Sequence, residues 1–135
     1  MVELEKIKAR KVDGGRAKIV AIDLGGTNLR IAVVKGRKIL KYWKEKTPSR
    51  SVEIKARIFG LVENFMSDDV KGIAVASPGP LKDGTIRNPP NLPLRNWNLE
   101  KALGDRFKVP VVVKNDADCV AFAELNLGHR KRNFI

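Results

Sequence analysis

AIDLGGTNLR, residues 21–30, decides the fold of this chain. An apolar run at residues 19–22 leads into Asp23 and two adjacent glycines, and a second apolar run at 31–34 follows the turn. This order predicts a strand, a tight turn and a second strand. Because glycines carry no side chain that would cover the backbone, the N–H groups of the turn stay open to an anion such as a phosphate. Asp23 can hold Mg²⁺ directly or through water, since a hard cation takes oxygen ligands. An ordinary hairpin with a Gly-Gly turn is the alternative.

The length and composition are those of a globular protein. The 135 residues predict one domain, or one lobe of a larger protein. No apolar stretch approaches the roughly 20 residues that span a bilayer, so no membrane partner is expected. The N-terminus lacks the apolar core of a signal peptide, which predicts a cytoplasmic protein. The single cysteine, Cys119, excludes a disulfide within the chain.

A net charge of +12 favours anionic ligands such as nucleotides or nucleic acid. The lysines and arginines are spread along the chain, and the densest groups lie at residues 6–18 and 129–132. Aromatic residues do not alternate with basic ones, as they often do in proteins that bind single strands. We therefore expect nucleotide phosphates as partners and no specific nucleic acid.

The hydrophobic pattern predicts three strands followed by alternating helices and strands. The predicted strands are 18–23, 29–34, 38–46, 71–76 and 109–114. The predicted helices are 51–66, 99–106 and a buried one that ends at Leu127. The proline-rich and asparagine-rich stretch 77–95 is predicted to be a structureless loop, and a loop of this length in a compact domain is usually functional.

These elements predict an α/β fold with a mixed five-stranded sheet, strand order 3-2-1-4-5, flanked by helices. That order fits a ribonuclease-H-like lobe of the kind found in actin-like ATPases and sugar kinases. Residues 1–17 are expected to form a basic arm, and residues 18–135 the lobe. The first, fourth and fifth strands run parallel, so the loops at their carboxyl ends gather along one rim, where open sheets bind ligands. These loops are 23–27, 77–97 and 115–118.

Four blocks of the chain resemble the ROK family (repressors, open reading frames and kinases), which includes bacterial and archaeal glucokinases. They are Asp23–Arg30, Ser77–Leu81, Asn88–Pro93 with Trp97, and Asn115–Asp118. All four occur in the family's order, and the resemblance covers about residues 18–135. It implies transfer of a phosphoryl group from ATP to a hexose hydroxyl with Mg²⁺, catalysed by positioning and charge neutralisation.

The resemblance also implies roles for single residues. Asp116 matches the general base that accepts the hydroxyl proton. The phosphates of the nucleotide would lie on Asp23, Gly25, Gly26 and Thr27, with Asp23 also serving the metal. The sugar would contact Ser77, Gly79, Asn91, Asn115 and Asp116. Local roles remain as alternatives: Asp116 suits a helix N-cap, the asparagines suit turns, and Ser77 suits a strand end.

Two departures from the family pattern bear on activity. Asp118 stands where the family commonly has Asn. Family kinases also carry a second lobe with the adenosine pocket, and this chain has no counterpart to its motifs. The chain is therefore expected to be the N-terminal, sugar-side lobe, with little activity alone, because kinase lobes must close around both substrates. Its expected partner is the missing lobe or another copy of the chain, since the face that meets the second lobe would be apolar.

Two other functions remain open. A sugar-sensing regulator of the same family is one, although 17 residues before the lobe do not supply a DNA-binding domain. A metal-dependent nuclease on the ribonuclease-H-like fold is the other, with Asp23, Asp116 and Asp118 as metal ligands. The nuclease hypothesis explains neither the glycine pair nor the asparagine–proline loop.

Overall fold

The computed structural model describes residues 17–115. The predicted helix that ends at Leu127 and residues 1–16 of the predicted arm lie outside the described residues. Neither described helix is long and apolar enough to cross a membrane.

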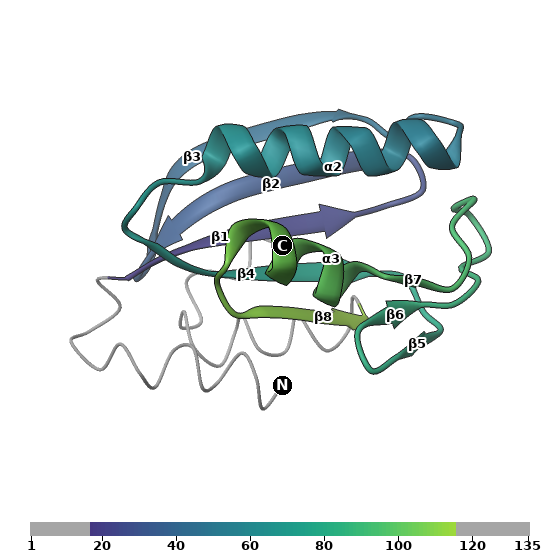
Figure 1. Ribbon diagram of the computed structural model, residues 1–135. Coiled ribbons are helices and arrows are strands. Elements are labelled where there is room, and N and C mark those ends of the chain that lie inside the picture. The colour runs from purple at the N-terminus through teal and green to yellow at the C-terminus, as the bar shows by residue number, and fades with distance from the viewer. Residues whose placement is uncertain (1–16, 116–135) are drawn as a thin grey trace.

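A mixed five-stranded sheet forms the centre of the described chain (Figure 1), in the order β3-β2-β1-β4-β8. The strands β1 and β2 pair antiparallel, as do β2 and β3, whereas β4 pairs parallel with both β1 and β8. This confirms the predicted order 3-2-1-4-5, with β8 as the predicted fifth strand. The bounds are Lys18–Leu24 for β1, Asn28–Lys35 for β2, Lys38–Lys46 for β3, Val70–Ser77 for β4 and Val111–Asn115 for β8.

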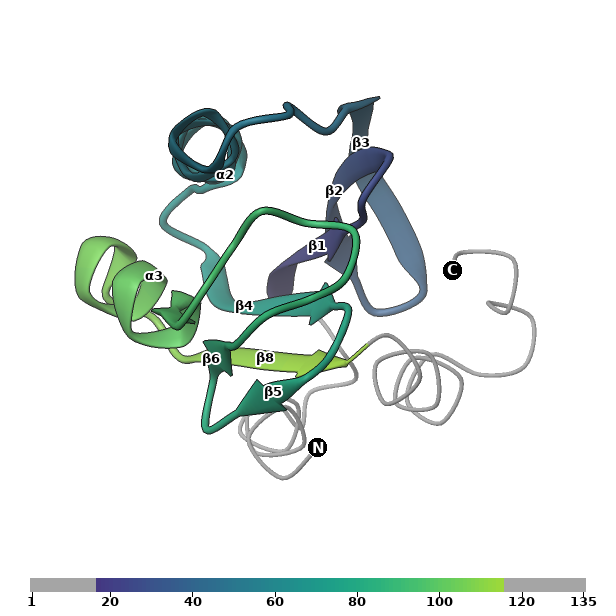
Figure 2. The same ribbon diagram turned by 90° about the vertical axis from the view of Figure 1, so that its right-hand side faces the viewer.

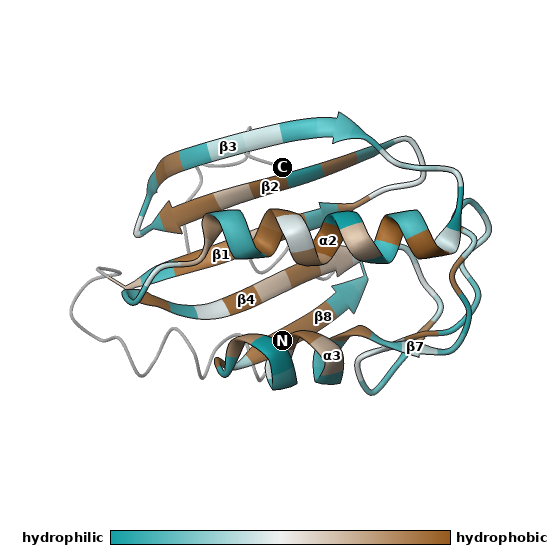
Figure 3. Cartoon of the chain, turned by 45° about the horizontal axis from the view of Figure 1, so that its top comes forward, coloured by the Kyte–Doolittle hydropathy of each residue, from teal (hydrophilic) through white to brown (hydrophobic). Residues whose placement is uncertain are grey.

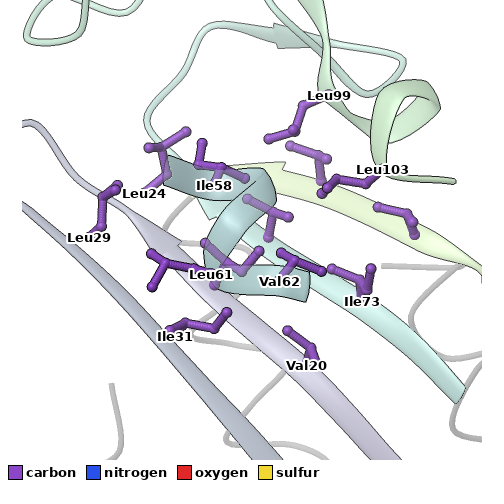
Figure 4. Packing of buried hydrophobic residues seen from close by; sticks show 14 of the residues in the cluster. Val20, Leu24, Leu29, Ile31, Ile58, Leu61, Val62, Ile73, Leu99 and Leu103 are labelled. Atoms are coloured by element: carbon purple, nitrogen blue, oxygen red, sulfur yellow. The ribbon is translucent and has the colours of Figure 1, made fainter. Parts of the chain in front are cut away.

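Two helices, α2 (Ser51–Phe65) and α3 (Leu99–Phe107), cover one face of this sheet (Figures 1 and 3). Strand residues alternate between the two faces, so every second residue of β1 points under the helices. The buried residues of β1 are Val20, Ile22 and Leu24. Figure 4 shows two of them, Val20 and Leu24, in one apolar cluster with Ile58 and Leu61 of α2. The side chain of Asp23 consequently lies on the opposite face of the sheet.

The stretch 77–95 is not structureless, and that prediction was wrong. It contains two short strands of a second, antiparallel sheet with the order β5-β6-β7. The bounds are Leu81–Lys82 for β5, Thr85–Ile86 for β6 and Trp97–Asn98 for β7. Asp83 and Gly84 make the turn between β5 and β6, with φ values of 51° and 79°. An Asp-Gly pair with positive φ is typical of a two-residue hairpin turn. The Asp-Gly pair in the sequence therefore indicated this hairpin, which was not predicted.

The second sheet is anchored to the core by apolar side chains. Ile86 and Leu94 are fully buried, and Leu92 is nearly so. Trp97 of β7 packs against Phe59 of α2, with ring centroids 6.4 Å apart. Figures 1 and 2 show the second sheet beyond the carboxyl end of β8. The stretch between β4 and α3 is therefore held at the edge of the main sheet where the predicted ligand loops begin.

Candidate active site

The carboxyl ends of the three parallel strands stand side by side. Asp23 of β1 pairs in register with Ala76 of β4, and Ala76 pairs with Lys114 of β8. Ser77 and Asn115, the last residues of β4 and β8, form the next pair. Since neighbouring strands lie about 4.8 Å apart, the three strand ends span about 10 Å. The loops that follow these strands therefore begin close together.

The turn after β1 leaves two backbone N–H groups open. The N–H of Gly25 donates to the carbonyl oxygen of Asn28 at 3.0 Å. Thr47 binds the turn twice: its hydroxyl donates to the Gly25 carbonyl oxygen at 2.6 Å, and its N–H donates to the Thr27 carbonyl oxygen at 2.9 Å. Gly26 and Thr27 are exposed, and within residues 17–115 their N–H groups donate to no acceptor. Two adjacent open N–H groups make a cradle for an anion.

Close contacts, and not unusual dihedral angles, explain the two glycines. Neither Gly25 nor Gly26 has a positive φ. A Cβ atom on Gly25 would lie 2.9 Å from the carbonyl oxygen of Asn28. A Cβ atom on Gly26 would lie 2.8 Å from both the Cβ and the carbonyl oxygen of Asn91. Gly26 therefore lets the loop that carries Asn91 rest on the turn, and Gly25 lets Asn28 approach the turn.

Asn91 is held at this contact by its neighbours in the chain. Leu92 and Leu94 are buried in the core, which fixes the backbone on one side of Asn91. The N–H of Leu92 also donates to the carbonyl oxygen of Pro89 at 3.4 Å. Asn91 itself is exposed. The structure thus brings together the predicted phosphate turn and one predicted sugar-binding residue, and leaves the amide of that residue accessible.

Asp23 has the setting of a metal-binding carboxylate. It is half-buried, and burial raises the pKa of its carboxyl group above the usual value, while the positive charge of Arg30 acts in the opposite direction. Arg30 faces Asp23 across the β1–β2 pair. Among residues 17–115, the carboxylate forms no ion pair or hydrogen bond. A half-buried carboxylate without such a partner could hold Mg²⁺ directly or through its bound water.

The other predicted sugar contacts differ in accessibility. Ser77 is fully buried, and its hydroxyl donates to the Pro78 carbonyl oxygen at 3.2 Å, so in this arrangement it ends the strand. Gly79 precedes a cis peptide bond, and a Cβ atom there would meet only the N atom of Leu81 at 3.9 Å. Asn115 is half-buried and already has an interaction partner in the protein. The fold alone therefore does not require glycine at position 79.

The predicted general base, Asp116, lies outside the described residues, as does Asp118. Asp116 directly follows Asn115, the last residue of β8. The part of the chain that the structure describes contains no group of three acidic, histidine or cysteine side chains that could hold a metal. The proposed nuclease ligands Asp116 and Asp118 lie beyond that part.

Thr47 is the residue that the sequence analysis missed. A signal was present in the strand order, however. The antiparallel pairing of β2 with β3 matches Asn28 with Lys46, so Thr47 must stand next to Thr27.

The sheet order and the loops at the carboxyl ends of the parallel strands define a lobe of the actin-like ATPase fold, the fold of the solved sugar kinases that it resembles. Residues 19–133 match the ROK family, and the chain belongs to it.

Curated relatives are sugar kinases. A β-glucoside kinase of Listeria monocytogenes is 39% identical over 123 residues, which cover 82% of this chain and 39% of the relative. A glucokinase of Aeropyrum pernix is 33% identical over 117 residues, covering 83% of this chain and 37% of the relative. This chain thus spans about two-fifths of the length of the curated relatives that it matches.

Solved structures of ROK family proteins superpose on the chain. A ROK family glucokinase from Streptomyces griseus, in complex with glucose and AMPPNP, superposes with a TM-score of 0.73 at 30% identity, over 82% of this chain and 37% of that one. A ROK family transcriptional regulator, a homologue of the Escherichia coli MLC protein, superposes with a TM-score of 0.76 at 24% identity, over 90% of this chain and 33% of that one. At this identity the regulator supports the fold alone.

Proposed function

We propose that this chain is the sugar-side lobe of an ATP-dependent hexose kinase. The observation that carries the proposal is the contact between Gly26 and Asn91, which joins an open phosphate cradle to an accessible amide at one rim of the sheet. The names of the relatives support it: two are a glucokinase and a β-glucoside kinase. The Streptomyces griseus enzyme of the same fold binds glucose and AMPPNP.

The phosphate side of the proposed site lies in the turn after β1. The N–H groups of Gly26 and Thr27 bind phosphate oxygens, and the Thr27 hydroxyl adds a further donor. Asp23 holds Mg²⁺ directly or through a water molecule. When bound, the metal neutralises the charge that develops on the transferred phosphoryl group. Arg30 has no direct contact with the substrate in this proposal, and its charge partly offsets the effect of burial on the pKa of Asp23.

The sugar side lies in the loops after β4 and β8. The amide side chains of Asn91 and Asn115 each donate and accept hydrogen bonds, which suits a polyol. Gly79 lets the sugar approach the backbone, because a side chain there would fill the space it needs. Asp116 accepts the proton from the sugar hydroxyl as that oxygen attacks phosphorus. Ser77 is the buried last residue of β4 and precedes the loop that carries Gly79.

The described residues form one lobe, and a second lobe would be needed to cover the substrates. A kinase site must exclude water to favour transfer to the sugar over hydrolysis, and closure of two lobes achieves this. We therefore expect the isolated chain to bind a hexose weakly without turning it over. Phosphoryl transfer is expected once a carboxyl-terminal ROK lobe is supplied.

Calorimetric titration of the chain with a panel of hexoses tests this function. Weak binding of at least one hexose is expected, with loss of binding in Asn91→Ala. Asn64→Ala is the matched control, because Asn64 lies on the exposed side of α2, away from the rim. If a chain with an intact thermal unfolding transition binds no hexose, or if Asn91→Ala binds as well as Asn64→Ala, the proposed sugar site is wrong.

A further inference from the structure

Thr47 makes two hydrogen bonds to the turn that contains the open N–H groups. Its hydroxyl donates to the Gly25 carbonyl oxygen at 2.6 Å, and its N–H donates to the Thr27 carbonyl oxygen at 2.9 Å. These acceptors belong to the residues on either side of Gly26. Thr47 is half-buried, directly follows β3, and takes no part in the sugar or phosphate contacts described above.

We propose that Thr47 is the positioning residue that sets the phosphate turn, residues 25–27, in its anion-binding form; this inference rests on the proposed phosphate role of that turn. The argument follows from the planarity of the peptide bond. In a trans peptide the carbonyl and the N–H of the same unit point in opposite directions. The Gly25 carbonyl shares its peptide unit with the N–H of Gly26. Holding that carbonyl toward Thr47 therefore aims the Gly26 N–H away from Thr47, into the open.

The hydrogen bond from the Thr47 hydroxyl replaces the hydrogen bond that closes an ordinary β-turn. In an ordinary four-residue β-turn the first carbonyl accepts from the N–H three residues later. Here that carbonyl is the one of Gly25, and it accepts from the Thr47 hydroxyl in place of the Asn28 N–H. Without the hydroxyl, the Gly25 carbonyl is free to rotate toward Asn28. The Gly26 N–H would rotate with it, and the cradle would lose one of its two donors.

Substitution can separate the hydrogen bond that the Thr47 backbone N–H donates from the one that its hydroxyl donates. Thr47→Val keeps the size, the β-branching and the backbone N–H, and removes only the hydroxyl donor. Thr47→Ser keeps the donor and removes a methyl group. The pair therefore distinguishes the positioning role from packing, because a packing role would respond more to the lost methyl group than to the lost hydroxyl.

The test uses the 135-residue chain, labelled with ¹⁵N, and inorganic pyrophosphate with Mg²⁺ as the probe. Two quantities are measured: the amide shift of Gly26 without ligand, and the dissociation constant of pyrophosphate. In Thr47→Val the Gly26 amide is expected to shift and the affinity to fall about fivefold to tenfold, the effect of one lost hydrogen bond. In Thr47→Ser the Gly26 amide stays close to its wild-type position and the affinity stays within about twofold of wild type, since the donor is kept. Unchanged shifts for the core amides of α2 verify that both variants fold.

The outcomes distinguish failure of the role of Thr47 from failure of the proposed phosphate role of residues 25–27. Wild-type affinity and an unmoved Gly26 amide in Thr47→Val would overturn the role of Thr47 while leaving the phosphate turn intact. A wild-type chain that does not bind pyrophosphate would overturn the proposed phosphate role. In that case an unmoved Gly26 amide in Thr47→Val would still overturn the role of Thr47.

Discussion

Gly26→Ala is the substitution whose effect follows most directly from the structure. The added Cβ atom would lie 2.8 Å from both the Cβ and the carbonyl oxygen of Asn91. Unstrained contacts between carbon atoms are about 3.5–4.0 Å, so the Asn91 loop must withdraw by about 0.7 Å or more. The neighbouring Leu92 and Leu94 are buried, which resists that movement. We expect the free energy of unfolding to fall by about 1–3 kcal/mol, the usual cost of overpacking.

Urea denaturation of wild type, Gly26→Ala and Gly60→Ala measures this cost. Gly60 lies inside α2, and a Cβ atom there would meet nothing within 4 Å. Gly60→Ala is therefore expected to raise the free energy of unfolding by about 0.5–1 kcal/mol, because alanine favours the helix over glycine. The two glycine-to-alanine changes thus move stability in opposite directions.

Hexose affinity is the second readout for Gly26→Ala. Displacement of the Asn91 backbone moves the amide that the sugar contacts, so affinity is expected to fall while Gly60→Ala binds as wild type does. If Gly26→Ala is as stable as wild type and binds hexose equally well, Gly26 and Asn91 do not touch, and the two halves of the proposed site are not joined.

Three further predictions concern two residues of the site and one ion pair at the opposite end of β1. Asp23→Asn is expected to abolish the Mg²⁺ dependence of nucleotide binding. The melting temperature is expected to stay the same or rise, because burial raises the pKa of Asp23 and its charge is therefore unfavourable to the fold at neutral pH. A marked loss of stability would contradict this. Gly79→Ala is expected to leave the melting temperature nearly unchanged, since its Cβ has only an ordinary contact, and to weaken hexose binding; equal binding would remove Gly79 from the site. Asp69 accepts hydrogen bonds from Lys18 and from Ser67, which together lower the pKa of Asp69 to about 2. A lowered pKa stabilises the fold above the unfolded value of 3.8, so stability is expected to fall between about pH 4 and pH 2 in acid-unfolding curves, and this fall should be smaller in Asp69→Asn.

The main sheet was predictable because its strands are marked by apolar runs and its turns by glycine. The bounds of β3 match the prediction of 38–46, and α2 ends one residue before the predicted end. The parallel arrangement of β1, β4 and β8 followed from the intervening helices, since parallel strands need long crossovers. The position of the three loops at one rim followed from the same arrangement.

The details of the candidate site were less predictable, because they depend on contacts between distant segments. The sequence does not reveal that Asn91 rests on Gly26, since that contact depends on how buried Leu92 and Leu94 seat the loop. The hydroxyl bond of Thr47 likewise depends on the register of β3 against β2. The hairpin of β5 and β6 was predictable from Asp83-Gly84, but proline and asparagine nearby favoured an irregular loop.

The proposed function requires that the sugar and the metal–phosphate group bind side by side at one rim of the sheet. The most direct test is proton relaxation of glucose in the presence of the chain and ATP, with Mn²⁺ in place of Mg²⁺, because Mn²⁺ takes the same oxygen ligands and broadens the signals of nearby protons. We predict broadening of the glucose signals that requires the chain and is lost in both Asn91→Ala and Asp23→Asn. Glucose that binds the chain without such broadening would place the sugar and the metal apart, and would contradict the account.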